Sequence, residues 1–501
     1  GDPGLERALF GIQSEAAPEA FDLVMGRDIK QPANLDVRLT IDSELQKEAV
    51  AQLRDRHGAV VVLNPQTGEV LAMYSNPSYS LKAVQQDEET WVRLNTNQRD
   101  RPLVNRSLGA YYVPGSTFKT VVMTAAFLNG MQDSVFSGSP GGFIAEPGAK
   151  PITDDNGSCE VCGPMHIDQA LMISSNQFFA QMAVKLGPER LGATARLFGI
   201  GTYDDPNDLL RGRKRPDIWN ASTDAVRRAL APRESTILSS PKMRRYDLAL
   251  EGFGQGYAGQ QTPLQMAMIV SAIANLQGQL MKPKIEYDLP PAVFNQVMPP
   301  QIAAEERRLM GLVTMGPSGT GTSVFAPVTA QGIPTGGKTG TAQKEVPEYD
   351  PKTGEMLTEK KIERDRRGNP IREYEVPILS PEKRIDSWFL CIAPLDRPQL
   401  AIAVIVEGGG YGARAAAPIA AALVLKARDL GLLTVTGAAP QQPQAQPPPQ
   451  RGQPTPGQQR TPQAPGQPSP QPSATPRPST TPRPRSTPAA RQRNANAAAG
   501  R

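Results

Sequence analysis

The stretch Pro114-Gly115-Ser116-Thr117-Phe118-Lys119, with the apolar run that follows it to Leu128, decides the fold of this 501-residue chain. That run predicts a helix, because it lies between a Pro-Gly loop and a stop at Asn129-Gly130. Ser116 then lies at the helix N-terminus, where unpaired N–H groups and the positive end of the dipole face a developing oxyanion. Lys119 follows three residues later and lies one turn away on the same face.

This pair can supply a nucleophile and its base. A lysine acts as a base only when it is neutral, and burial, the helix terminus and a second lysine nearby would each lower the pKa of Lys119. The alternative is that Ser116 only caps a core helix. Two further Ser-x-x-Lys matches, at 239–242 and 380–383, carry a proline that disfavours the required turn, which leaves Ser116 as the candidate.

A second polar segment, Ser174-Ser175-Asn176, interrupts two apolar helical patterns at 167–173 and 178–186. It predicts a tight turn between two helices. A hydroxyl at Ser174 can pass a proton between a leaving group and Lys119, and the Asn176 amide offers donors and an acceptor to a substrate or to Lys119. Taken alone, the segment fits an ordinary helix N-cap better than a catalytic turn.

The third segment is Lys338-Thr339-Gly340-Thr341, which the apolar runs 386–393 and 400–406 follow after an insertion. This pattern predicts adjacent antiparallel strands. Gly340 would let a peptide approach the strand edge, and Lys338 with the hydroxyls of Thr339 and Thr341 can hold a carboxylate. The backbone N–H groups of Thr341 and Ser116 are candidates for an oxyanion hole. A second Lys-Thr-Gly at 352–354 lies in a charged turn and predicts a hairpin tip.

Several classes of enzyme are excluded by what the sequence lacks. The chain has two histidines, His57 and His166, and no Gly-x-Ser-x-Gly elbow, so a Ser-His-Asp hydrolase does not fit. No dinucleotide fingerprint or Walker loop occurs either. The glycines at 252–256 predict a turn that leads into a helix beginning near Thr262-Pro263. The residues therefore indicate an active-site serine acyltransferase without a cofactor.

The ordered triple of Ser-x-x-Lys, Ser-x-Asn and Lys-Thr-Gly resembles the motif set of penicillin-binding proteins and class A β-lactamases. Longer stretches are similar to class B penicillin-binding proteins in particular, and they lie at 58–65, 68–73, 105–106, 114–119, 254–256 and 262–267. The resemblance covers about 37–433. It implies an α/β (α+β) fold with a five-stranded antiparallel sheet flanked by helices, an all-helical lobe and a cleft between them.

The resemblance also implies a peptidoglycan D,D-transpeptidase that works outside the cytoplasm at the bacterial cell membrane. Ser116, activated by Lys119, would attack the penultimate D-Ala of a stem peptide, and Ser174 would relay the proton. An amine of a second stem peptide would then resolve the acyl-enzyme, while Asn176, Lys338, Thr339, Gly340 and Thr341 hold the peptide. β-Lactams would acylate Ser116, and a membrane glycosyltransferase is an expected partner. The alternatives are a D,D-carboxypeptidase or β-lactamase, in which water is the acceptor, and a β-lactam sensor without turnover.

Three regions lie outside the motifs. Residues 1–36 resemble the end of the family's N-terminal pedestal module with no membrane-spanning run before it, so we expect a processed product, a fragment or a piece of a larger protein. Residues 37–433 form the expected transpeptidase domain. Residues 434–501, rich in Pro, Gln and Arg, predict a disordered tail. The tail has eight arginines and no acidic residue, so its charge is +8. Because the whole chain has a net charge of +5, the remainder has a net charge of −3. The tail is either a spacer or a segment attracted to anionic polymers.

The charged insertion at 344–384 predicts one or two hairpins over the rim of the active site. It is either a gate or docking element or a tolerated surface insertion.

The cysteines leave more than one interpretation open. Cys159 and Cys162 form a Cys-x-x-Cys with His166 after it and Asp154 and Asp155 before it, which is a conceivable zinc site. A disulfide or free thiols are the alternatives. Cys391 lies in an apolar strand pattern and is expected in the core.

Overall fold

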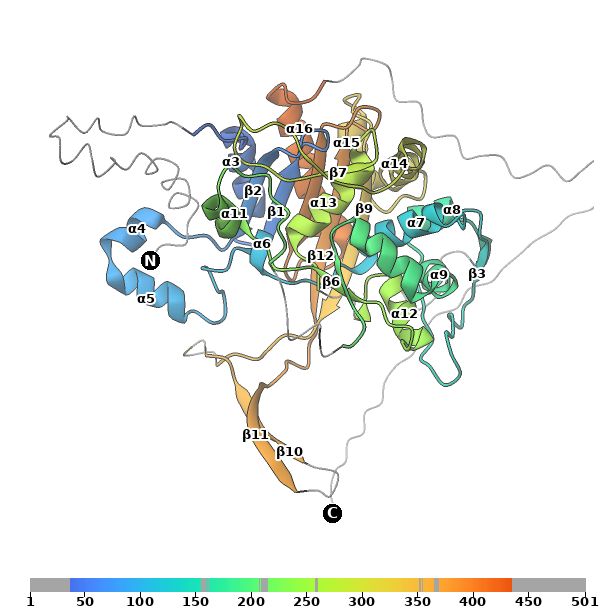
Figure 1. Ribbon diagram of the computed structural model, residues 1–501, viewed down its shortest axis with the longest axis horizontal. Coiled ribbons are helices and arrows are strands. Elements are labelled where there is room, and N and C mark those ends of the chain that lie inside the picture. The colour runs from blue at the N-terminus through green and yellow to red at the C-terminus, as the bar shows by residue number, and fades with distance from the viewer. Residues whose placement is uncertain are drawn as a thin grey trace, which may run out of the picture. The chain divides into compact units, whose positions relative to one another are not determined.

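A five-stranded sheet with the order β2-β1-β13-β12-β9 forms the centre of the molecule, and every neighbouring pair is antiparallel (Figure 1). The computed structural model describes residues 37–434 except 155–158, 160–161, 207, 209–214, 257–259, 351–352, 354 and 365–368. The strands are β1 Gly58–Leu63, β2 Val70–Asn76, β9 Gly336–Lys344, β12 Arg384–Ala393 and β13 Leu400–Val406. The predicted sheet is confirmed, and β9 with Lys338–Thr341 is its edge strand.

Strands β1 and β13 are apolar along their whole length, and β12 is apolar from Trp388 onward, because both faces of the sheet are covered. In β12, Trp388 and Leu390 belong to the core on one face, whereas Phe389 and Cys391 belong to the core on the other. Cys391 is fully buried, as its apolar surroundings predicted. The same alternation occurs in β1 and β13, so three strands separate the two cores.

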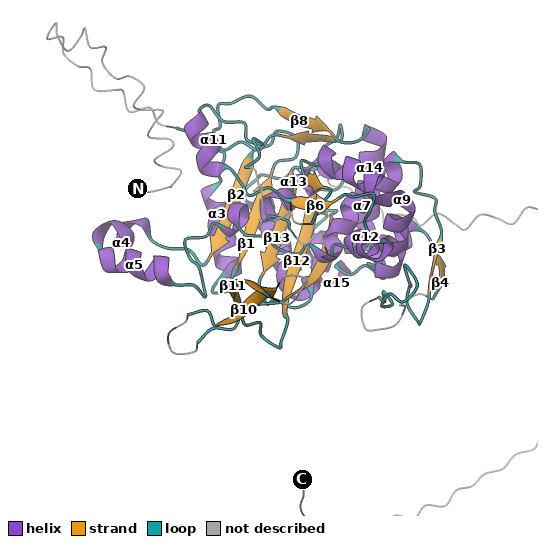
Figure 2. Ribbon diagram, turned by 60° about the horizontal axis from the view of Figure 1, so that its bottom comes forward, coloured by secondary structure: helices purple, strands orange, loops and turns teal. Residues whose placement is uncertain are grey.

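Helices cover both faces of the sheet (Figure 2). One face packs against α3 Ser43–Leu53, α15 Thr322–Thr329 and α16 Gly412–Asp429. The other face packs against α13 Pro263–Ala274, every residue of which is buried. Thr262 caps α13 by accepting a hydrogen bond from the N–H of Gln265 at 3.2 Å, and Pro263 is its first residue, which confirms the predicted start of this helix.

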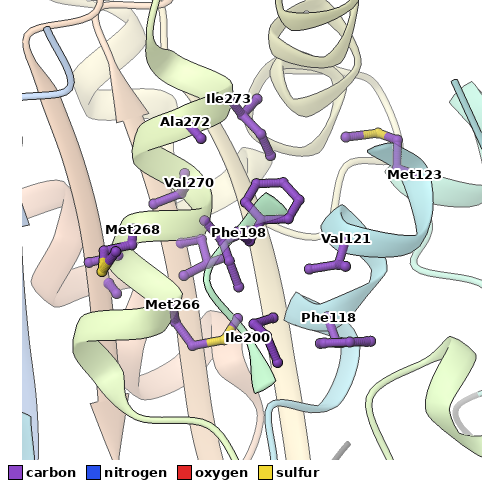
Figure 3. Close-up of a cluster of buried hydrophobic side chains, with 14 of the residues drawn as sticks. Phe118, Val121, Met123, Phe198, Ile200, Met266, Met268, Val270, Ala272 and Ile273 are labelled. Carbon is purple, nitrogen blue, oxygen red and sulfur yellow. The ribbon is translucent and has the colours of Figure 1, made fainter. Parts of the chain in front are cut away.

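The helical lobe lies beyond α13. It contains α7 Lys119–Leu128, α8 Ile167–Met172, α9 Asn176–Leu197, α12 Arg245–Gly252 and α14 Pro300–Met315. Figure 3 shows Phe118, Val121 and Met123 facing the side chains of α13, so the helix that follows Ser116 is anchored in the main core. This packing fixes the nucleophile segment between the lobe and the sheet.

The remaining elements are short. The helices are α4 Leu81–Gln86, α5 Glu88–Thr96, α6 Arg106–Gly109 and α11 Asp224–Leu230. The strand pairs are β3 Phe136–Gly138 with β4 Gly163–Met165, β5 Gly201–Tyr203 with β6 Thr236–Leu238, and β7 Gln279–Met281 with β8 Val293–Gln296. Within the described residues, the helices are all too short or too polar to span a bilayer.

The insertion forms one antiparallel hairpin, β10 Thr358–Arg364 with β11 Pro370–Pro377, which projects away from the sheet (Figure 1). The prediction of a hairpin is therefore confirmed. The predictions for residues 1–36 and for the tail from 435 onward lie outside the described residues.

Candidate active site

Ser116 lies on a short 3-10 helix, Gly115–Phe118, that continues directly into α7. The predicted position at a helix N-terminus is confirmed, with the first turn tighter than an α-helix. Ser116 is partly exposed, whereas Lys119 is fully buried. Gly115 has a φ of +53° and donates a backbone hydrogen bond to Gly254 at 3.0 Å. The predicted glycine turn at 252–256 thus supports the nucleophile segment, a role that the sequence did not indicate.

The Ser-Ser-Asn segment forms the expected tight turn between α8 and α9. Ser174 has a φ of +64°, a conformation that a residue with a Cβ rarely adopts and that is common at functional sites. The Nζ of Lys119 donates to the Ser174 carbonyl oxygen at 2.5 Å, to Ser174 Oγ at 3.2 Å and to Asn176 Oδ1 at 2.8 Å. The structure therefore brings the first two motifs into direct contact.

Strand β9 completes the constellation. The Nζ of Lys338, a fully buried residue, donates to Ser174 Oγ at 2.8 Å. Ser174 Oγ therefore accepts from two lysines that lie 219 positions apart in the chain (338 minus 119). A hydroxyl held between two amines can pass a proton from one group to another.

Two hydroxyls of β9 also have partners from elsewhere in the chain. Thr339 Oγ1 lies 2.7 Å from Thr320 Oγ1, and Thr341 Oγ1 accepts from the N–H of Gly412 at 3.4 Å.

Gly340 has a packing role that differs from the one expected. A Cβ built on it would lie 2.8 Å from Thr117 Cγ2, 2.9 Å from Trp388 Cβ and 3.1 Å from the Pro114 carbonyl oxygen. The absence of a side chain thus lets the nucleophile segment rest on the edge strand. The approach of a substrate peptide to this strand stays a prediction.

A cavity of about 290 Å³ opens at this junction. Ser116, Ser174, Thr339 and Thr341 line it, whereas Lys119, Asn176, Lys338 and Gly340 are not among its lining residues. The sequence analysis missed six lining residues: Ile173, Thr320, Tyr411, Gly412, Ala413 and Arg414. The glycines at 408–410 signal a turn after β13, but nothing in the sequence places that turn beside Thr341. No described residue of the insertion lines the cavity.

Asp154 also lines the cavity, and it caps the Ser-Ser-Asn turn. Its Oδ1 accepts from the backbone N–H groups of Asn176 at 2.6 Å and Gln177 at 3.0 Å, and from Ser175 Oγ at 3.1 Å. The carboxylate therefore satisfies donors at the start of α9, where a negative charge is favourable.

Cys159 and Cys162 are joined by a disulfide, one of the three alternatives left open by the sequence. Within the described residues, which omit Asp155, no group of three or more His, Cys, Asp or Glu residues converges on a possible metal position. Zinc at Cys159, Cys162 and His166 stays a prediction for a metal assay.

The arrangement defines a class of protein. A serine at a helix start, a buried lysine one turn away and a relay hydroxyl bonded to a second lysine on an edge strand are the parts of an active-site serine acyltransferase. The chain belongs to the family of the penicillin-binding protein transpeptidase domain, whose model matches residues 58–425.

Named relatives agree with this membership. The chain is 28% identical over 418 residues to the peptidoglycan D,D-transpeptidase MrdA of Haemophilus influenzae, covering 77% of this chain and 55% of that protein. It is 27% identical over 456 residues to the peptidoglycan D,D-transpeptidase PbpA of Mycobacterium tuberculosis, covering 84% and 76%. The chain thus spans about half the length of the MrdA relatives of H. influenzae and Acinetobacter baumannii, at 55% and 52%.

Solved structures share the fold. The imipenem acyl-enzyme complex of penicillin-binding protein A from M. tuberculosis superposes with a TM-score of 0.61 at 25% identity, covering 85% of this chain and 87% of that one. The D,D-transpeptidase domain of a peptidoglycan glycosyltransferase from Eggerthella lenta gives a TM-score of 0.60 at 27% identity, covering 83% and 89%.

Proposed function

We propose that this chain is a peptidoglycan D,D-transpeptidase that cross-links stem peptides through an acyl-enzyme on Ser116. The observation that carries the proposal is the pair of contacts from Lys119 and Lys338 to Ser174 Oγ beside the cavity that Ser116 lines. The relatives named MrdA and PbpA are D,D-transpeptidases, and the M. tuberculosis protein forms acyl-enzyme complexes with penicillin G and imipenem.

In the proposed reaction Lys119 accepts the proton of Ser116 as its oxygen attacks the carbonyl carbon of the penultimate D-Ala. This step requires the neutral amine of Lys119, which is fully buried and donates to Ser174 and Asn176 in the resting site. The bond to the terminal D-Ala breaks, and Ser174 passes a proton to the departing amine. The N–H groups of Ser116 and Thr341 stabilise the oxyanion, and Lys338, Thr339 and Thr341 hold the terminal carboxylate. An amine of a second stem peptide then attacks the acyl carbon, the ester bond to Ser116 breaks, and the proton that the amine loses returns to the Ser116 oxygen.

One feature favours an amine over water as the acceptor. A β-lactamase needs a base that activates water, and the carboxylate among the described lining residues is that of Asp154. Its Oδ1 already accepts two backbone N–H groups and a hydroxyl, so it is engaged in holding the turn. The proposal includes a location outside the cytoplasm at the cell membrane. It also includes a membrane glycosyltransferase as a partner.

The test is acylation. The chain is incubated with benzylpenicillin, and its intact mass is followed over hours beside the Ser116→Ala variant. We expect a stable adduct on the parent chain and none on the variant. Rapid loss of the adduct would indicate a β-lactamase, and an adduct that persists on Ser116→Ala would remove the catalytic assignment.

A further inference from the structure

Trp388 of β12 is fully buried, and its indole reaches the loop that leads to the nucleophile. Its Nε1–H donates to the carbonyl oxygen of Val113 at 3.0 Å. Its ring meets the ring of Tyr112 edge to face, with the centroids 5.9 Å apart and the planes at 88°. One side chain of the central sheet therefore holds the backbone that lies three residues before Ser116.

The same tryptophan lies where β9 meets the nucleophile segment. Trp388 pairs with Gly340 across the two strands, and a Cβ built on Gly340 would lie 2.9 Å from Trp388 Cβ. A Cβ built on Gly115 would lie 2.5 Å from the carbonyl oxygen of Thr341, so the nucleophile segment rests on β9 with no side chain between them. The two segments are thus in close contact at Ser116 and Thr341, whose N–H groups are the proposed oxyanion donors.

Hydrogen bonds from outside the sheet hold the other side of this loop. Tyr112 exchanges two backbone hydrogen bonds with Gln261, and the N–H of Gly115 donates to the carbonyl oxygen of Gly254. Both of these partners lie in the segment between α12 and α13. The bond from Trp388 instead ties the loop to β12, the strand that pairs with β9.

We infer that Trp388 is a positioning residue, whose indole N–H sets the distance between the nucleophile segment and β9 and so aligns the oxyanion donors at Ser116 and Thr341. The inference rests on the proposed function. An oxyanion hole is effective only when its donors lie about 2.7–3.1 Å from the developing oxyanion, so a small displacement of either donor slows the reaction. Because the indole is buried, breaking its bond would leave a costly unsatisfied donor, and the loop is therefore held at one distance from the sheet.

Two replacements that remove the indole N–H test this role. Trp388→Phe keeps an aromatic ring without a donor. Trp388→3-benzothienylalanine, introduced by stop-codon suppression, keeps the size of the indole and has sulfur in place of the N–H. The measurement is the second-order rate constant of acylation by benzylpenicillin, from intact mass against time. We expect both variants to be acylated about tenfold more slowly than the parent chain.

A vibrational measurement separates positioning from a loss of stability. The ester carbonyl of the acyl-enzyme would lie in the oxyanion hole, and hydrogen bonds to its oxygen lower its stretching frequency. Benzylpenicillin labelled with ¹³C at the β-lactam carbonyl isolates this band in infrared difference spectra of the acyl-enzyme. We expect the band to move to higher frequency in both variants, because the donors are less well aligned. A lower stability alone would leave the band in place.

Trp219 provides a matched control. Its indole is 2% exposed, and its Nε1–H donates to the carbonyl oxygen of Leu230 at 2.8 Å, so Trp219→Phe removes the same kind of buried hydrogen bond. Leu230 ends α11, and neither residue lines the cavity. We expect Trp219→Phe to keep the acylation rate and the ester band of the parent, although urea unfolding should show a loss of stability similar to that of Trp388→Phe.

The possible failures are distinguishable. If the benzothienylalanine variant has the rate and the ester band of the parent, the inference is overturned while the proposed function stands. The same conclusion follows if Trp219→Phe slows acylation as much as Trp388→Phe does. If benzylpenicillin does not acylate the well-folded parent chain, the proposed function fails and this inference fails with it.

Discussion

Ser174 is the residue on which the site converges, and its backbone is in an unfavourable conformation. Its φ of +64° places Cβ close to the following carbonyl oxygen, which costs a residue other than glycine about 1–2 kcal/mol. The packing of α8 and α9 on either side holds the turn in this state. The hydroxyl then points at Lys119 and Lys338.

Replacing Ser174 with glycine and with alanine separates this strain from the chemistry. Both variants lose the hydroxyl, so we expect acylation by benzylpenicillin to slow in both by about 10²-fold or more. Glycine adopts the positive φ freely, so Ser174→Gly should be more stable than Ser174→Ala by about 1 kcal/mol in urea unfolding. Equal stability of the two variants would show that the turn relaxes, and unimpaired acylation in both would remove Ser174 from the relay.

The sequence predicted the motif residues of the active site, but not most of the residues that contact them. Ser116, Lys119, Ser174, Asn176 and the Lys338–Thr341 segment follow from residue types at fixed spacings, and the structure brings them together around one junction. The sequence did not predict that Arg414 and Thr320 line the cavity, because this depends on which segments the fold places beside β9. Asp154 was considered as a metal ligand, but its neighbours in space are the N–H groups of α9, which local spacing cannot reveal.

At the scale of elements, Asp154 joins a loop to the start of α9. Removing this cap in Asp154→Ala should lower the free energy of unfolding by about 1–2 kcal/mol and slow acylation, because the turn that holds Ser174 and Asn176 loses its anchor. Asp154→Asn keeps an oxygen acceptor and should retain most of both properties. Urea unfolding and acylation rates of the two variants provide the measurement. If Asp154→Ala were as stable as Asp154→Asn and were acylated as fast, Asp154 would have no part in positioning the turn.

The β10–β11 hairpin projects from the sheet and buries none of its described side chains. Its residues with described side chains are exposed or partly exposed, and none lines the cavity. The N–H of Ile378 donates to the carbonyl of Leu357 at 2.9 Å, so an Asn-Gly turn can replace residues 358–377 without moving the strand ends. We expect the free energy of unfolding of the shortened chain to lie within about 0.5 kcal/mol of that of the parent. Its acylation rate should also be unchanged. Loss of acylation at full stability would instead favour the alternative of a gate, and the measurements are urea unfolding and intact mass.

At the scale of the whole molecule, the five-stranded antiparallel sheet followed from the resemblance and the adjacent strands β9, β12 and β13 from apolar runs, whereas the links between distant elements did not. The clearest link is a buried ion network around Glu407, which directly follows β13. Its carboxylate accepts from Arg106 of α6 at 3.0 Å, from Arg384 of β12 at 2.8 Å and from the Tyr112 hydroxyl at 2.7 Å. Arg106 and Glu407 are 301 positions apart, so no spacing in the sequence pairs them.

This network makes the stability of the fold depend on pH in a defined window. Burial by itself would raise the pKa of Glu407, but the guanidinium groups of Arg384 and Arg106 and the hydroxyl of Tyr112 outweigh it and lower the pKa to about 2 from the ordinary 4.5. Between these values the unfolded chain binds the proton more readily than the folded one. The contribution is therefore fully present above about pH 4.5 and is lost as pH falls toward 2, and it amounts to about 3 kcal/mol.

Glu407→Gln should remove that dependence on pH and lower the stability of the protein at neutral pH. At pH 7 the variant leaves Arg106, which is 2% exposed, facing a neutral amide, so we expect its free energy of unfolding to fall by about 3 kcal/mol. Below pH 4.5 the parent should lose stability toward the level of the variant, because protonation of Glu407 produces the same neutral side chain. Urea unfolding at steps from pH 7 to pH 2.5 measures both curves, with the exposed Glu382→Gln as the control that keeps the parent's slope. Curves that stay parallel through the acid window would mean that Glu407 is not the group through which acid weakens the contact between α6, β12 and β13.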